Sequence, residues 1–187
     1  MKIAQVAPLY ESVPPQQYGG TERVVSFLTE ELVRQGHEVT LFASGDSVTA
    51  ARLYPACDRA LRLHKPKVTN PLAYHISMIE MVARQAEDFD LVHFHIDYLS
   101  FPVTRRDRIP AITTLHGRLD IPELAPLFRE FRDMNLVSIS KAQRHPVPLA
   151  NWVGTVHHGL PLDLIRPLQP QPNRKGAYLA FIGRISP

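Results

Sequence analysis

Apolar positions along this chain follow two periods, which predict strands and helices in alternation. Short, nearly continuous apolar runs are typical of buried strands, and apolar residues that recur every three or four positions are typical of amphipathic helices. Strands are expected at residues 2–7, 38–43, 90–95, 111–115, 136–139, 154–157 and 178–182. Helices are expected at residues 21–35 and 72–87, with shorter ones at residues 99–105 and 123–133.

Local features refine these elements. Thr21 stands where a helix cap is preferred and Gly36 where a helix often ends, so the first helix is expected to run between them. In the second helix, Ile76, Ile79 and Val82 share the apolar side. The stretch 50–68 has no clear period, although its residues 61–64 are compatible with a short strand.

Strands with little polar alternation, separated by helices, indicate a parallel sheet covered on both faces. With right-handed crossovers, this order predicts an α/β fold with a doubly wound, Rossmann-like sheet, whose ligand crevice lies at the carboxyl ends of the strands. Residues 1–160 are expected to form this domain. Residues 161–176 are expected to be a stiff linker, because four prolines fall within residues 161–172. Residues 177–187 would then provide the first strand of a further domain.

Composition and charge narrow the function classes. The 187 residues are 44% apolar and carry a formal net charge of +3 with scattered basic residues, so a nucleic-acid partner is not expected. The single cysteine, Cys57, cannot form a disulfide within the chain or a cysteine-rich zinc site. No apolar run approaches the roughly 18 residues of a membrane span, and the short apolar start lacks a signal-peptide pattern. A cytoplasmic protein is expected, and peripheral contact at the inner membrane surface is compatible with the sequence.

Two glycines, Gly19 and Gly20, stand directly before the first expected helix. Glycines at this place let the backbone approach a ligand closely, and the amides at a helix start attract phosphate. The segment YGGTE does not match the G-x-G-x-x-G dinucleotide fingerprint, and its distance from the first strand is too long for that turn. The glycine pair is therefore either ordinary turn chemistry or part of a phosphate site.

The segment HFHID, residues 93–97, places His93 and His95 on the same side of a strand. It resembles the H-x-H-x-D signature of zinc hydrolases of the metallo-β-lactamase type, but Tyr98 stands where that signature has another histidine. The competing interpretation is one buried histidine bonded to the backbone and one histidine at the crevice. That interpretation is preferred because a zinc ion needs three or four converging ligands, so no metal is expected.

Another histidine, His116, ends a different expected strand in the segment TTLHG. Because the strand ends of such a sheet meet at the ligand crevice, His95 and His116 are expected to converge there. Ser140 also follows a strand and could serve either the crevice or a helix cap. His158 and Gly159 look like a turn at the end of the domain.

Seven segments, in order, resemble the amino-terminal domain of retaining GT-B nucleotide-sugar glycosyltransferases of the group 1, or family four, class. They are KIAQVAPLY…YGGTERVV, RQGHEVTLFAS, DLVHFH, TTLHG, LVSIS, VHHGLPLD and FIGRISP, and they span nearly the whole chain. The resemblance implies transfer of a sugar from a UDP- or GDP-linked donor to a small or lipid-linked acceptor, with retention of configuration. It implies no metal and no other cofactor.

The resemblance also implies roles for individual residues. Gly19, Gly20 and Arg184 would bind the donor diphosphate, where amide dipoles and cations stabilise the charge of the leaving group. His116 would be the catalytic residue, beside the donor sugar at the reaction centre.

The acceptor side is matched by His95 and Asp97. Because most of the family's nucleotide pocket lies in a carboxyl-terminal domain, the chain alone is expected to be inactive or weakly active and to need that domain as a partner. Exposed apolar surface at the domain interface would then favour self-association. Two alternatives stay open: a non-catalytic binding or interaction remnant of this fold, and a zinc hydrolase that uses the HFHID segment.

Overall fold

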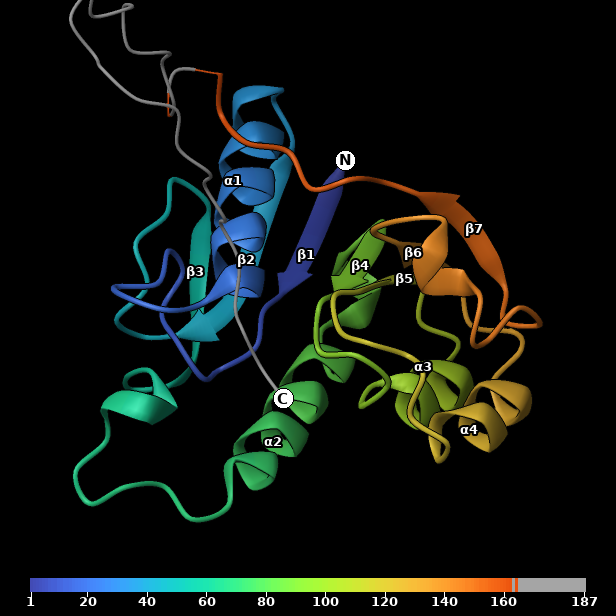
Figure 1. Ribbon diagram of the computed structural model, residues 1–187. Helices are drawn as coiled ribbons and strands as arrows, with labels where there is room; N and C mark the ends of the chain where they lie inside the picture. Colours follow the sequence, from blue (N-terminus) through green and yellow to red (C-terminus); the bar gives the residue numbers. More distant parts are fainter. Residues whose placement is uncertain (163, 165–187) are drawn as a thin grey trace, which may run out of the picture.

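The computed structural model of the protein describes residues 1–162 and 164. Within these residues, seven strands form one sheet (Figure 1). The strands are β1 (Lys2–Val6), β2 (Glu38–Ser44), β3 (Arg52–Cys57), β4 (Leu91–Phe94), β5 (Ala111–Leu115), β6 (Leu136–Ser138) and β7 (Trp152–Thr155). The expected linker, apart from its first residues, and the expected strand at residues 178–182 lie outside the described residues.

The order of the strands shows that the sheet is doubly wound. The chain builds outward from β1 through β2 to β3, then returns to the other side of β1 and adds β4, β5, β6 and β7 in turn. All neighbouring strands pair in parallel. The predicted α/β, Rossmann-like fold is therefore confirmed. The order in which strands are added to the sheet reverses between β1 and β4. The carboxyl ends of the strands at such a switch point are where this fold binds ligands.

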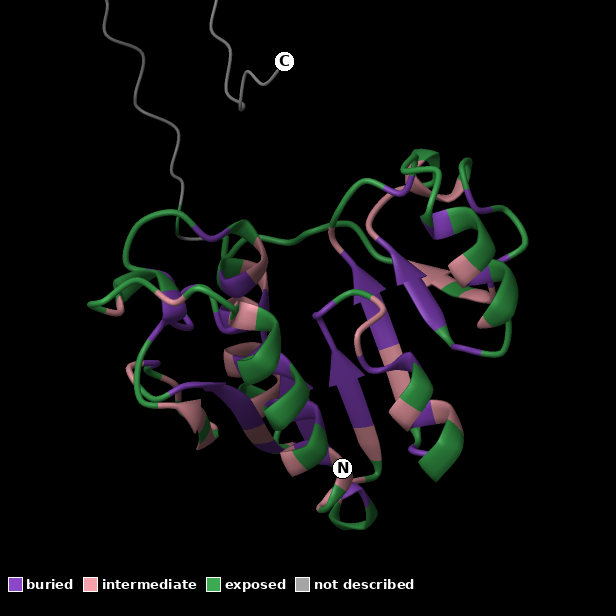
Figure 2. Cartoon of the chain, turned by 90° about the horizontal axis from the view of Figure 1, so that it is seen from below, coloured by how far each residue is buried: buried purple, intermediate pink, exposed green. Residues whose placement is uncertain are grey.

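Helices cover the two faces of the sheet. They are α1 (Gly20–Arg34), α2 (Pro71–Ala83), α3 (Phe101–Asp107) and α4 (Leu124–Glu130). α1 shares a buried cluster with Leu41 and Ala43 through Val25, whereas α2 shares one with Phe42 through Met78. Figure 2 shows the central strands buried between helices whose outer sides are exposed. None of the helices in the described part of the chain is long and apolar enough to cross a membrane.

Strand alternation turns a row of polar side chains toward the face that carries α1. Val6 and Phe94 belong to the buried cluster under α2, so Gln5 and His93, which are register partners on β1 and β4, point to the opposite face. Gln5 is fully buried there. Because buried polar groups need hydrogen-bond partners, this face must hold a polar network.

α1 begins one residue earlier than predicted. Gly19 occupies the N-cap position and Gly20 is the first helical residue, so the prediction that Thr21 caps the helix was wrong. Glycine is an accepted N-cap residue, and its extended backbone here (φ 166°) lets the helix start directly after the loop. At the other end Gly36 has φ 85°, the left-handed conformation that a glycine after a helix supplies, as predicted.

The stretch 50–68 also differs from its prediction. It contains the edge strand β3, which the sequence pattern did not reveal because β3 is only partly buried and includes Pro55, a residue that edge strands tolerate. The expected short strand at residues 61–64 is a turn of 3-10 helix, Leu61–Leu63. In α2 the buried side is formed by Met78, Ile79 and Val82 with His75, while Ile76 is 53% exposed, so the predicted apolar side was rotated.

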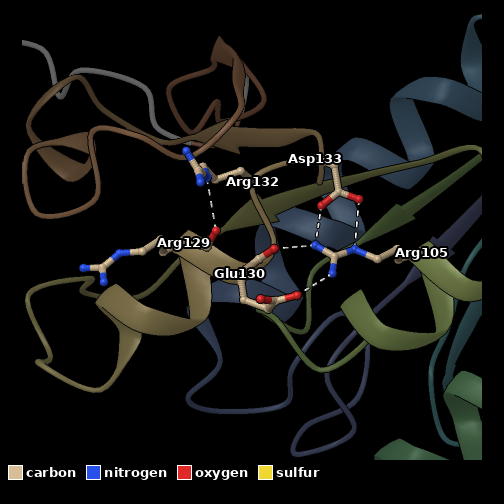
Figure 3. A network of polar contacts seen from close by, with 5 residues as sticks. All are labelled: Arg105, Arg129, Glu130, Arg132 and Asp133. Atoms are coloured by element: carbon tan, nitrogen blue, oxygen red, sulfur yellow. Dashed lines mark hydrogen bonds and ion pairs between the residues drawn. The ribbon is translucent and has the colours of Figure 1, made fainter.

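An ion-pair network joins α3 to the segment after α4 (Figure 3). Arg105 donates to both carboxylate oxygens of Asp133 and, through Nη1 at 2.9 Å, to Glu130. Its guanidinium also lies 4.3 Å from the centre of the Phe131 ring. Since α3 leads into β5 and Asp133 leads into β6, this network fastens the amino ends of these strands and leaves their carboxyl ends free to carry a site.

Candidate active-site cleft

A cleft of about 610 Å³ lies at the switch point of the sheet. Its walls come from the loop after β1, the starts of α1 and α2, the 3-10 turn Leu61–Leu63, the loops after β4 and β5, and the segment after β7. The cleft brings together these predicted site residues: Gly19, Gly20, His95, Asp97 and His116. The remaining predicted residue, Arg184, lies outside the described residues.

The two glycines have different steric surroundings. A Cβ atom on Gly19 would lie 2.7 Å from the Cβ of Pro15, closer than real Cβ contacts allow, and 3.0 Å from Oε2 of Glu22. A Cβ atom on Gly20 would meet nothing within 4 Å. Gly19 is therefore required by the close approach of the loop to the helix, whereas Gly20 leaves open space in the cleft.

Substitution of the two glycines should separate these roles. Gly19→Ala is expected to lower the free energy of unfolding by about 1–3 kcal/mol, because the new methyl group is overpacked against Pro15. Gly20→Ala should leave the free energy unchanged or raise it slightly, since alanine is the better helix former. Urea denaturation of both variants measures the difference, and equal stabilities would contradict the steric argument.

Two charged side chains that the sequence analysis did not single out also line the cleft. Glu22, in the first turn of α1, is buried, and this burial raises the pKa of its carboxyl group. Arg62 is the only arginine or lysine on the cleft wall among the described residues. Its Nη1 donates to Oε1 of Glu11 at 2.9 Å, and its guanidinium lies 5.7 and 5.6 Å from the ring centres of Tyr10 and Tyr18.

Four histidines run from the buried sheet out to the cleft, and we call them the histidine chain: His93, His95, His116 and His158. The Nδ1 atom of His95 lies 2.9 Å from Nε2 of His116, and Nδ1 of His116 lies 3.0 Å from Nε2 of His158. Ring centres are 4.1 Å apart for His93 and His95, and 5.2 and 5.1 Å apart for the next two pairs. His95 and His116 thus converge, as their places at two strand ends predicted.

Gln5 holds the inner end of the histidine chain. Its Oε1 accepts a hydrogen bond from Nε2 of His95 at 2.8 Å, and its amide donates to Nδ1 of His93 at 3.4 Å. His93 in turn donates through Nε2 to Oγ1 of Thr114 at 2.7 Å. The expectation that one of the two histidines of HFHID bonds to the backbone was wrong, because both are buried on the face where Gln5 and Thr114 offer side-chain partners.

Burial keeps the histidine chain neutral. It lowers the pKa of His93 to about 4 and that of His116 to about 3, with repulsion from neighbouring histidines adding to the shift of His116. Burial also lowers the pKa of His95 well below its usual range, and it lowers the pKa of His158 at the cleft. At neutral pH each ring therefore carries one N–H and one bare nitrogen.

The sequence pattern that defines Glycosyltransferase Family 4 matches residues 18–184 of the chain. The chain belongs to glycosyltransferase family 4. The matched range contains the glycine pair and all four members of the histidine chain. A comparison with curated proteins found no significant match.

Two solved structures resemble this family 4 domain. MurG of Acinetobacter baumannii superposes with a TM-score of 0.50 at 14% identity, covering 86% of this chain and 46% of that one. AviGT4, a glycosyltransferase involved in avilamycin A biosynthesis, gives a TM-score of 0.44 at 23% identity, covering 79% of this chain and 39% of that one. The chain thus spans less than half the length of either protein. The likeness is one of fold, and the family match alone assigns this Rossmann-like domain to glycosyltransferase family 4.

The zinc hydrolase interpretation of HFHID finds no ligand set in this family 4 domain. Within residues 1–162 and 164, no three histidine, cysteine, aspartate or glutamate side chains gather in a way that could hold a metal ion. The ring nitrogens of His95 and His116 face neighbouring side chains rather than a common centre. The family match also favours the glycosyltransferase class over the hydrolase class.

Asp97 lies on the cleft wall directly after β4 with a left-handed backbone (φ 52°). Aspartate and asparagine adopt this conformation more readily than other residues with a side chain. Partial removal from water raises the pKa of its carboxyl group. Asn is therefore the matched replacement for removing the charge, because it suits the same backbone conformation.

His158 is the cleft residue that the sequence analysis placed only in a turn. His158 lies two residues after Val156, and Val156 lines the apolar hollow beside α1 together with Val137. If the alternation of a strand is continued beyond β7, the side chains of Val156 and His158 point to the same side of the sheet, which is also the side of His116.

The helix-cap alternative for Ser140 fits the structure, because its Oγ accepts from the backbone N–H of Gln143 at 3.1 Å.

Proposed function

We propose that this family 4 domain is one half of a glycosyltransferase that transfers a sugar from a UDP- or GDP-linked donor to a small or lipid-linked acceptor, with retention of configuration. Gly19 and Gly20 bind the donor diphosphate, and His116 stands beside the donor sugar as the catalytic residue. His95 and Asp97 line the acceptor side. A carboxyl-terminal domain completes the nucleotide pocket. Arg184 contributes a cation to this pocket.

The observation that carries this proposal is the uncapped amino terminus of α1 inside the cleft. The first hydrogen bond of the helix runs from the N–H of Arg23 to the carbonyl of Gly19 at 3.1 Å, so the N–H groups of residues 20–22 precede the helical ladder. Gly19, the N-cap residue, has no side chain to cap them, and in this turn the carboxyl group of Glu22 bonds only to the N–H of its own residue, which leaves the N–H groups of Gly20 and Thr21. Free amides at the positive end of a helix attract phosphate oxygens, and the glycines keep Cβ atoms out of the way.

A methyl group at Gly20 tests this proposal. Gly20→Ala is expected to weaken binding of UDP or GDP about tenfold, because the methyl group enters the space that the diphosphate would occupy. Isothermal titration of both nucleotides against the wild-type chain and the variant measures the change. Gly154→Ala is the matched control, since a Cβ there also meets nothing and Gly154 lies on β7 outside the cleft. Equal affinities for wild type and Gly20→Ala would argue against a diphosphate at this helix.

The proposal that two domains form the donor site predicts how tightly sugar nucleotides bind to one domain and to both. A panel of UDP- and GDP-sugars should bind this chain weakly, and a form extended past Pro187 should bind the correct donor more tightly and transfer its sugar. The reason is that one domain supplies only part of the diphosphate contacts. Tight binding of one particular donor sugar to residues 1–187 alone would contradict the division into two halves.

Apolar side chains near β7 predict self-association of this chain. Val153, Val156, Leu160 and Leu162 are all more than half exposed, and Val156, Leu160 and Leu162 line an apolar hollow of about 620 Å³ beside α1. Such a surface favours contact with a second copy or with a further domain. Sedimentation velocity over a range of concentrations should show reversible association that Val156→Lys reduces, and a monomer at all concentrations would contradict the prediction.

A further inference from the structure

Both ring nitrogens of His116 are occupied. Nε2 faces His95 and Nδ1 faces His158, at 2.9 and 3.0 Å. His116 can therefore offer a nitrogen to a ligand only by giving up one of these bonds. The open nitrogen of the histidine chain is Nδ1 of His158, for which no described residue provides a partner.

Gln5 determines which nitrogen of each ring carries the proton. Its carboxamide oxygen can only accept, so the bond to His95 requires a proton on Nε2 of His95. A neutral His95 then has a bare Nδ1, which accepts from Nε2–H of His116. By the same rule His116 has a bare Nδ1, which accepts from Nε2–H of His158. The series ends with a bare, basic Nδ1 on His158.

We propose that His158 is a ligand-binding residue whose bare Nδ1 accepts a hydrogen bond from a hydroxyl group of the sugar in the cleft, and that Gln5 is the positioning residue that sets this nitrogen through His95 and His116. The inference rests on the proposed glycosyltransferase function for the identity of the ligand. A sugar hydroxyl suits the site because it can donate to a neutral imidazole nitrogen without a proton transfer.

The surroundings of His158 define how the site responds to pH. Protonation of Nδ1 replaces the acceptor with a donor, so the hydrogen bond to the sugar is lost in acid. Proton passage inward is opposed, because His116 and His95 are enclosed and a charge on either would be desolvated. Besides His95 and His116 of the histidine chain, the charged or titratable groups on the two hollows that His158 touches are Tyr10, Tyr18, Glu22, Arg62, His75, Asp97 and Tyr98 on the cleft side, and Glu30, Glu31, Arg34 and His157 on the side of α1.

The resonances of the histidine ring nitrogens in the wild-type chain show directly which nitrogen of each ring carries the proton. Long-range proton–nitrogen correlation spectra at pH 7.5 should show Nε2–H and a bare Nδ1 for His95, His116 and His158. Gln5→Met should mix the two tautomers along these three rings. Thr114→Val is the control, because it removes the partner of His93 and leaves the bond between Gln5 and His95 in place. A protonated Nδ1 on His158 in the wild-type chain would overturn the proposal.

Binding of UDP-glucose and GDP-mannose tests the ligand. For whichever probe binds, His158→Ala should weaken affinity about tenfold, the upper range for one neutral hydrogen bond. Wild-type affinity should fall in acid, below the usual pKa range of histidine, because burial lowers the pKa of His158. His158→Asn should keep most of the affinity, since its amide oxygen still accepts, but lose the dependence on pH. A merely structural role of His158 predicts no such separation. His157→Asn, next in sequence and outside the cleft, should behave as wild type.

The outcomes distinguish this inference from the proposed function. Binding that is equally tight in His158→Ala, or that stays pH-dependent in His158→Asn, would overturn the role of His158 while leaving the glycosyltransferase proposal intact. If neither sugar nucleotide binds the wild-type chain or its two-domain form, the proposed function and the sugar ligand both fail. The tautomer of His158 is still decided by the resonances in that case.

Discussion

Replacing His116 with alanine is expected to reduce the rate of sugar transfer by about 10²–10⁴-fold, the range that one catalytic side chain commonly contributes. His116 lies on the cleft wall with one nitrogen toward buried His95 and the other toward His158. The substitution removes the imidazole beside the proposed donor sugar, and it also disconnects His158 from the groups that set its proton. Initial rates of the two-domain protein with its sugar nucleotide measure the effect.

The matched control is His157→Ala. His157 is exposed, and its Nδ1 bonds to the carbonyl of Ile139 at 3.0 Å, outside the histidine chain. Its removal should leave the rate within a factor of about two, the effect of a small change in stability alone. Wild-type rates in His116→Ala, with the variant folded by circular dichroism, would remove His116 from the mechanism.

The second large effect is a loss of stability in mild acid. Between pH 6.5 and 4.5, the lowered pKa values of His93 and His116 should together reduce the free energy of unfolding by about 5 kcal/mol. Each histidine reduces it by about 1.4 kcal/mol per pH unit in this range. A histidine whose pKa is lower in the folded state binds fewer protons when folded. Its stabilising contribution is therefore complete above the unfolded pKa, near 6.5, and is lost as the pH falls toward the folded value, about 4 for His93 and about 3 for His116.

Other groups modify this acid transition. Burial also lowers the pKa of His75, which adds to the loss. The carboxyl groups of Glu22, which is buried, and of Asp97, which is partly removed from water, act in the opposite direction, because a raised pKa in the folded state stabilises the protein as the pH falls. Urea denaturation at pH 7.5, 6.5, 5.5 and 4.5 measures the sum, and His93→Gln should make the slope below pH 6.5 shallower. Equal slopes for wild type and His93→Gln would show that burial does not keep His93 neutral.

Periodic segments were predicted well because their cause is local. β1, β2, β4 and β5 bury nearly continuous apolar runs, and α1 buries one side of a regular three- and four-residue pattern. Their alternation was enough to predict a doubly wound sheet. The segments that were wrong or missed, β3 and the 3-10 turn at Leu61–Leu63, lack such a pattern, since an edge strand is buried on few sides and a short turn is held by its neighbours.

The candidate site was predicted in part for a related reason. His95, His116 and the glycine pair follow or precede regular elements, so the rule that strand ends meet at a crevice brought them together. Glu22 and Arg62 were missed because a first-turn glutamate and a loop arginine are common on any surface. Only the burial of Glu22 and the place of both side chains on the cleft wall single them out.

What the sequence determined by itself is the alternation of strands and helices apart from β3, the carboxyl end of the sheet as the place of the cleft, and most of the predicted residues there. These follow from apolar period and chain order, which are properties of neighbouring residues. The tertiary structure decided how the histidines are connected, because Gln5 and His158 lie 153 positions apart and are linked through His95 and His116 only when β1, β4, β5 and the segment after β7 are packed together. Proton placement depends on those long-range hydrogen bonds and on burial, and no local pattern encodes either.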